Sequence, residues 1–138
     1  MTCAVPALVA ATGTASAAPA PVPATRARPV VVDCMWHPQV RPGDFLIACG
    51  DGNSRLVSLS WSHWGSTSAE ARGVNVVNDC KPYCAAGTFR SYPVIVRLDH
   101  PAPWKKHPQT RHYTRMSLVY PQGRPEGFGP VVNYPLWD

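Results

Sequence analysis

The chain has 138 residues, of which 45% are hydrophobic and only 15% charged, with a formal net charge of +5. This length suits one small domain, and these proportions exclude a disordered polyelectrolyte and a coiled coil. Because 16 Pro and 10 Gly residues interrupt helices, a helical bundle is excluded as well. No run of about 18 apolar residues is present, so we expect no transmembrane segment in the mature chain.

The N-terminal region differs in composition from the rest, because no residue before Arg26 is charged. An apolar stretch over residues 3–11 is followed by small residues at 15–17, which is typical of a secretory signal peptide and its cleavage site. The basic residues that normally begin a signal peptide are absent, and a disordered Ala/Pro-rich tail is the alternative. We expect a secreted protein that begins at or near Ala18.

The chain therefore divides into three parts. We predict a signal peptide over residues 1–17, a flexible Ala/Pro-rich leader over 18–29 and a single all-β domain over 30–138. About 109 residues remain for the domain, which is enough for a core but not a large one, so cross-links are expected to contribute.

Alternating or β-branched segments predict short strands. They cover residues 30–33, 45–49, 57–62, 73–77, 92–98, 111–120 and 130–137. The GDGN sequence at 50–53 is typical of a hairpin turn. The one candidate helix, at residues 67–72, is a turn or two at most. Six to seven short antiparallel strands predict a small sandwich or barrel, stapled by two disulfides.

Five cysteines are present, and Cys3 falls within the predicted signal peptide. The remaining four, Cys34, Cys49, Cys80 and Cys84, allow three disulfide connectivities. We favour Cys34 with Cys49 and Cys80 with Cys84, since the first pair closes a strand-turn-strand loop and the second closes the tight CKPYC loop. A zinc site of four thiolates is the alternative, but it normally needs two closely spaced cysteine pairs.

Several landmarks recur in a familiar order: ACGDGN, LSWSHWG, NDCKPYCAAGTF, YPVIVRL and YTRMSLVYPQGRP. Their order over about residues 34–125 resembles a group of small exported proteins of unknown function from high-GC Gram-positive bacteria. This resemblance implies export and a disulfide-stapled β domain. It implies no activity, and no functional residue is transferred from it.

No motif predicts catalysis or a cofactor. His100, His107 and His112 lie within a Pro-rich stretch beside two lysines, which is a poor setting for a metal ion, and we expect none. A G-x-S-x-G motif and a patterned carboxylate pair are both absent from the sequence. We therefore expect a protein that is not an enzyme and holds no cofactor.

The sharpest asymmetry is the segment WKKHPQTRHYTR at residues 104–115, which has four Lys or Arg residues and no acid. Basic residues interleaved with aromatic ones can bind polyanions by ion pairing and stacking. The candidate binding residues are Trp64, Trp104, Lys105, Lys106, Arg111, Tyr113 and Arg115. We expect Arg111, Tyr113 and Arg115 to face solvent. Trp64 is a candidate for an exposed glycan-stacking ring, and the commoner alternative is a strand end that folds its Trp over the sheet edge. The alternative is a solvated loop that keeps the domain soluble.

These observations favour a monomeric, non-catalytic binding or structural module that attaches to an anionic envelope polymer or glycan. Nucleic acid is not an expected partner of an exported protein. An inhibitor of secreted proteases is the first alternative, because the Cys80 to Cys84 loop could be presented rigidly. A small secreted hydrolase is the second.

Overall fold

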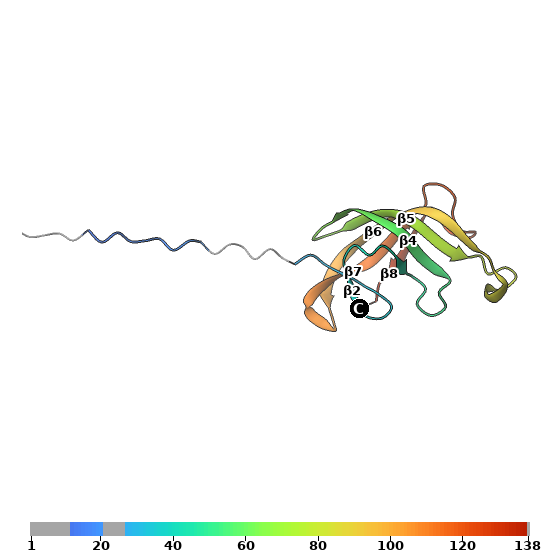
Figure 1. Cartoon of the computed structure of the whole chain (residues 1–138), viewed down its shortest axis with the longest axis horizontal. Coiled ribbons are helices and arrows are strands. Elements are labelled where there is room, and N and C mark those ends of the chain that lie inside the picture. The colour runs from blue at the N-terminus through green and yellow to red at the C-terminus, as the bar shows by residue number, and fades with distance from the viewer. Residues whose placement is uncertain (1–11, 21–26, 138) are drawn as a thin grey trace, which may run out of the picture.

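The computed structural model describes residues 12–20 and 27–137. Residues 1–11 of the predicted signal peptide and residues 21–26 of the predicted leader lie outside the described residues. From Val30 onward the regular elements are strands, apart from one 3₁₀ turn at Cys84–Ala86 (Figure 1). The prediction of an all-β fold is therefore confirmed.

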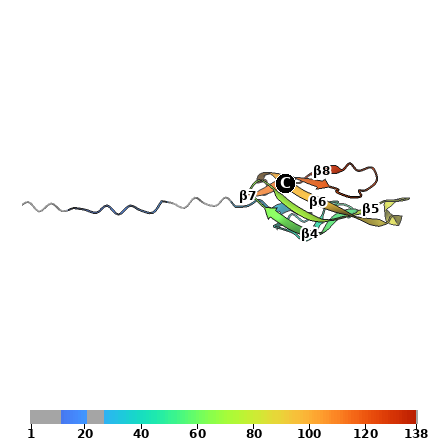
Figure 2. The same ribbon diagram turned by 90° about the horizontal axis from the view of Figure 1, so that it is seen from above.

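Six antiparallel strands form one sheet that curls into a half-barrel, and their order in space is their order in sequence. They are β3 (Phe45–Leu46), β4 (Ser54–Trp64), β5 (Ala69–Asn78), β6 (Phe89–Trp104), β7 (His107–Val119) and β8 (Val131–Pro135). In the view from above, β4 and β8 lie on opposite sides of the curled sheet (Figure 2). Local hairpins thus build the whole sheet, without a crossover.

A two-stranded antiparallel ribbon, β1 (Val31–Val32) and β2 (Pro38–Gln39), precedes the sheet. The backbone of Val30 bonds to β7 on both sides of His112, so the chain enters the fold along the edge of that strand. Both valines of β1 are buried, and Val31 belongs to the core. The ribbon therefore covers part of the apolar face of the half-barrel.

The core lies on the inner face of the curled sheet. Its fully buried residues include Leu56, Ala69, Ala71, Val94, Val96, Leu98, Met116 and Leu118. The alternation of these residues in β5, β6 and β7 is the period-2 pattern of a sheet with one covered face.

The short helix expected at residues 67–72 is wrong, because β5 already begins at Ala69. Ala69 and Ala71 are fully buried, while Glu70 and Arg72 alternate with them on the other face. The strand pairs with β4 on one side and β6 on the other, so tertiary pairing overrides the helical preference of the Ala, Glu and Arg residues.

Strands β6 and β7 are longer than the sequence indicates, and β6 extends through Pro101 and Pro103 to Trp104. Its last pair with β5 is Leu98 with Ala69, so among the described strands the Pro-containing end pairs with β7 alone. Proline lacks a backbone N–H and is tolerated where one edge of a strand is unpaired. The β6–β7 hairpin therefore projects beyond β5.

Both disulfides have the predicted pairing, Cys34 with Cys49 and Cys80 with Cys84. The first closes the segment that contains β2 and β3. The second closes the CKPYC loop, which Asn78 holds in place: its Nδ2 donates to Cys84 O and its Oδ1 accepts from Cys80 N. The GDGN turn is also confirmed, with Gly52 at φ 69° in the left-handed region.

Candidate functional site

Lys105 and Lys106 form the tip of the β6–β7 hairpin, as the sequence suggests. The Lys106 Nζ lies 4.5 Å from the centre of the Trp36 ring, which is 41% exposed in the turn between β1 and β2. A cation at this distance from an indole face is a favourable cation–π contact. Trp36 is absent from the residues predicted from sequence, because only the tertiary fold brings the ribbon turn to the hairpin tip.

Three further cations belong to the same end of the molecule. Arg28 lies two residues before Val30, which bonds to β7, and Arg41 lies two residues after the end of β2. Burial raises the pKa of Tyr113, and the positive charges of Arg28 and Arg41 oppose that rise. Arg111 lies on β7 beside Val30 and donates to Pro101 O. We call the group formed by Arg28, Arg41, Lys105, Lys106 and Arg111 the cationic end.

Most of these charges are not neutralised within the domain. Among residues 12–20 and 27–137, no carboxylate oxygen lies within 4.0 Å of a charged nitrogen of Arg28, Arg41, Lys106 or Arg111. The cationic end is therefore a concentration of positive charge carried by three separate segments of chain.

Arg115 does not join this group. Its guanidinium forms two 2.8 Å hydrogen bonds to the Asp99 carboxylate, which also accepts bonds from His100 Nδ1 and Arg97 Nε. The bidentate bond from Arg115 holds the pKa of Asp99 well below its usual range, against the opposing effect of burial. Arg115 is thus a partner in a structural ion pair, and its expected role in binding loses its basis.

The expectation that Trp104 and Tyr113 stack on a ligand is wrong, because both are buried. The Trp104 ring packs against His107, with ring centres 4.6 Å apart. The Tyr113 hydroxyl donates to Gly65 O at 2.5 Å, and burial raises its pKa. Simple alternation fails here: the neighbouring residues His112 and Tyr113 are both fully buried, and on the paired strand His100 departs from extended backbone, with φ 53°.

Trp64 is also buried, contrary to the prediction of an exposed ring. Its Nε1 donates to Pro29 O at 2.8 Å, and its ring packs edge-on against Trp61 and Tyr113. A register shift between Trp61 and His63 changes the alternation of β4 and turns Trp64 inward. Such a bulge leaves no periodic signal in the sequence.

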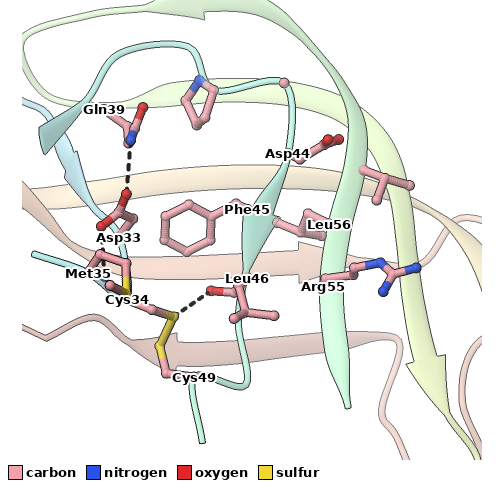
Figure 3. Close-up of a pocket in the computed structure, with 13 residues that line it drawn as sticks. Asp33, Cys34, Met35, Gln39, Asp44, Phe45, Leu46, Cys49, Arg55 and Leu56 are labelled. Carbon is pink, nitrogen blue, oxygen red and sulfur yellow. Dashed lines mark hydrogen bonds between the residues drawn. A yellow bond between two sulfur atoms is a disulfide. The ribbon is translucent and has the colours of Figure 1, made fainter. Parts of the chain in front are cut away.

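A pocket of about 580 Å³ lies between the β1–β2 ribbon and the edge strand β3 (Figure 3). Its walls are mainly apolar and include Phe45, Leu46, Leu56, Met35 and the Cys34–Cys49 disulfide. Two carboxylates, of Asp33 and Asp44, also line it. This pocket was not predicted from the sequence, because its two sides come together only through the disulfide and the curl of the sheet.

The carboxylate of Asp33 is tightly held. Its Oδ1 accepts from the backbone N–H groups of Met35 and His37, and its Oδ2 accepts from Gln39 Nε2 at 2.9 Å. Burial alone would raise the pKa of Asp33, but these hydrogen bonds outweigh it and leave the pKa below its usual value. The group is therefore a fixed negative charge at neutral pH.

A smaller pocket of about 450 Å³ lies at the opposite end, beside the CKPYC loop. Two ion pairs line it, Lys81 with Glu126 and Arg90 with Asp79. Its four charges cancel in two pairs, so it offers no net charge to a ligand.

The histidines do not converge on a site. His63 Nε2 lies 3.3 Å from Ser68 Oγ on the exposed β4–β5 turn, and among the described residues no carboxylate is hydrogen-bonded to the His63 ring. Within residues 12–20 and 27–137 no cluster of His, Cys, Asp or Glu could hold a metal ion. The part of the chain that the structure describes contains no helix able to cross a membrane.

Comparison of the chain with protein-family models, with curated proteins and with solved structures finds no match. Its function is therefore argued from its own residues.

Proposed function

We propose that this chain is an exported, non-catalytic binding module that attaches to an anionic polymer of the cell envelope through the cationic end. Teichoic and other acidic glycans are polymers of this chemistry. Two disulfides are typical of a protein that works in an oxidising compartment, which supports export.

The observation that carries this proposal is the packing of Lys106 on the exposed ring of Trp36, at the end of the molecule that also carries Arg28, Arg41 and Arg111. The cation–π contact holds the Lys106 ammonium over the ring, and the exposed part of the indole can pack on the apolar face of a sugar. Arg28, Arg41 and Arg111 extend the positive surface on either side. A chain of phosphates or carboxylates could therefore contact several cations at once.

Attachment of this kind gains free energy from the release of counterions that surround the polymer. Affinity should therefore fall by about tenfold or more between roughly 50 and 200 mM salt. It should not depend strongly on the identity of the polymer, since point charges recognise phosphate and carboxylate alike.

The test is binding of immobilised teichoic acid by the wild type and by Lys105→Glu/Lys106→Glu, at several salt concentrations. The double variant should bind at least about tenfold more weakly and show a shallower salt dependence. A matched control is Arg72→Glu/Arg124→Glu, which makes the same change in net charge on exposed residues away from the cationic end. Equal losses in both variants would show that net charge alone matters, and binding insensitive to salt would overturn the proposal.

Variants of Trp36 test the contribution of aromatic stacking separately from that of the charges. Trp36→Ala should weaken binding while leaving the salt dependence unchanged, and Trp36→Phe should restore part of the affinity. Unchanged binding by Trp36→Ala would remove the aromatic ring from the site.

One observation favours protease inhibition as a second candidate. The CKPYC loop is fixed by its disulfide and by Asn78, and it presents Tyr83 with 64% of its surface exposed. An inhibition panel of secreted proteases tests this candidate. Tyr83→Ala should abolish any inhibition found, and an effect unchanged in that variant would place the contact elsewhere.

A further inference from the structure

We infer that the pocket between the β1–β2 ribbon and β3 binds a small organic cation with an apolar body, such as an ammonium or guanidinium group on an aryl or alkyl stem. This site is separate from the cationic end and would serve a ligand of opposite charge.

The pocket has the size and lining of a small-molecule site. Its volume of about 580 Å³ falls in the range of ligand pockets, which are mostly apolar with a few polar groups. Phe45 forms its floor, and Figure 3 shows this ring between the two carboxylates, with Leu56 on one side and the Cys34–Cys49 disulfide below. An aryl or alkyl stem could pack against these groups.

The local charge is opposite to that of the whole protein. Asp33 and Asp44 line the pocket, whereas its one lining cation, Arg55, holds its guanidinium 5.6 Å from the centre of the Phe89 ring, which does not line the pocket. Arg41 precedes the lining residue Pro42 but does not itself line the pocket. The chain as a whole has a formal charge of +5, whereas this pocket is lined by two carboxylates.

The two carboxylates have different roles. Both oxygens of Asp33 already accept hydrogen bonds, so this residue contributes a fixed field. Asp44 is exposed and accepts one bond, from Ser58 N to Oδ1 at 3.1 Å, and no described residue donates to its Oδ2. We assign the direct contact with the cationic head to Asp44, since a charge-assisted bond to this oxygen displaces no partner within the described residues.

Exposed apolar side chains gather around the opening. Met35 is 71% exposed and Leu46 36% exposed, and both line the pocket. Val40, 54% exposed, follows the lining residue Gln39. Contiguous exposed apolar surface is costly unless something covers it, and the body of an amphiphilic cation would cover Met35 and Leu46 while its head reached Asp44.

A cationic group on an apolar stem occurs both in free amines and in the basic side chains of peptides. Two probes distinguish these two sources. The first is phenethylammonium, compared with the neutral 2-phenylethanol and the anion phenylacetate. The second is the blocked dipeptide acetyl-Phe-Arg-amide. Binding is followed by two-dimensional NMR of the intact secreted domain.

We expect phenethylammonium to shift the amide signals of Phe45 and Leu46, and to bind at least fivefold more tightly than 2-phenylethanol or phenylacetate. Tighter binding of the dipeptide than of the amine would identify a peptide as the source, and the reverse a free amine. Equal binding of cation, neutral compound and anion, or shifts confined to other residues, would overturn the inference.

Asp44→Asn keeps an oxygen for the bond from Ser58 N and removes the charge, and it should weaken cation binding at least fivefold without affecting the neutral compound. The matched control is Asp51→Asn on the GDGN turn, an exposed carboxylate that does not line the pocket. Equal binding by wild type and Asp44→Asn would overturn the inference. Lys105→Glu/Lys106→Glu should leave binding of the cation intact. The experiments can therefore contradict the cation-binding inference without contradicting polymer attachment, and the reverse.

Discussion

Asn75 is a fully buried polar residue whose hydrogen-bonding groups are satisfied. Its Nδ2 donates to Ser54 Oγ and to Arg55 O, and its Oδ1 accepts from Tyr120 Oη at 2.8 Å. These bonds connect β4, β5 and the end of β7 within the core. A buried amide is tolerated only when it is bonded in this way, so the network fixes the register of three strands.

Tyr120→Phe tests this network. The substitution leaves Asn75 Oδ1 buried without a donor, and we expect the free energy of unfolding to fall by about 1–3 kcal/mol. Urea denaturation followed by tryptophan fluorescence measures the change. Tyr83→Phe is the control, because this ring is exposed and its hydroxyl makes no described hydrogen bond. Equal stabilities of wild type and Tyr120→Phe would show that the Asn75 amide has another partner.

Asp99 makes stability depend on pH. Its pKa in the folded state is lowered, chiefly by the bond from Arg115, so its ionised form stabilises the fold. This contribution is fully present above the unfolded pKa of about 4 and is lost as the pH falls below it. We expect Asp99→Asn to cost about 2–3 kcal/mol at pH 7 and to lose less stability than wild type between about pH 4 and pH 2. Parallel acid-unfolding curves for the two proteins would contradict this assignment.

At the level of elements, the sequence predicted strands well where one face is apolar and regular. Val94, Val96 and Leu98 alternate cleanly and form the core face of β6, as expected. Trp64 was named as a candidate exposed ring because the alternation of residues in the sequence does not reveal the bulge between Trp61 and His63. The alanines of β5 suggested a helix because small residues carry little strand signal, and the pairing that decides the matter is not local.

The candidate site was only partly predictable for a similar reason. Runs of charge are visible in sequence, so Lys105, Lys106 and Arg111 were found. Trp36 was missed because a residue in one turn becomes a neighbour of a hairpin tip 70 residues later only through the closure of the half-barrel. Trp104 and Tyr113 were predicted to stack on a ligand, but both are buried. They were predicted to be exposed because the residues next to them in sequence are mostly charged or polar.

The two disulfides should contribute unequally. Cys34 and Cys49 are 15 residues apart, and a loop of this length is worth about 3 kcal/mol in the chain-entropy model. Cys80 and Cys84 are only 4 apart, so their loop restricts the unfolded chain less. We expect Cys34→Ser/Cys49→Ser to lower the free energy of unfolding by more than Cys80→Ser/Cys84→Ser does, measured by thermal unfolding. The opposite order would show that the CKPYC loop stabilises the native state by its contacts.

On the scale of the whole molecule, the half-barrel is closed by contacts between its two ends. The Trp137 ring stacks on Phe45, with ring centres 6.0 Å apart, and its Nε1 donates to Asp33 O at 3.0 Å. The last strand is thereby joined both to the first strand of the sheet and to the β1–β2 ribbon. Without these contacts the sheet would be an open meander with β3 at one exposed edge.

Trp137→Ala should open this closure. The loss of a partly buried ring and its hydrogen bond should cost about 2–4 kcal/mol and raise the hydrogen-exchange rates of the amides in the Cys34–Cys49 segment. Trp36→Ala is a suitable control, since the exposed ring of Trp36 lies outside the core and its removal should cost little. Exchange rates unchanged in this segment would show that the disulfide alone keeps it in place.

The ends of the domain also meet on one strand. Along the edge of β7, Tyr113 N donates to Val30 O, and the next residue, Thr114, accepts through its carbonyl oxygen from Leu136 N. Val30 and Leu136, near the two ends of the described domain, are therefore bonded to neighbouring residues of the same strand. A short linker from Trp137 to Val30, with new termini at the exposed Gln122 and Gly123, would keep every pair of strands. The fold is in this sense a ring, and such a circular permutant would separate Lys105, Lys106 and Arg111 from the residues that precede Val30, Arg28 among them.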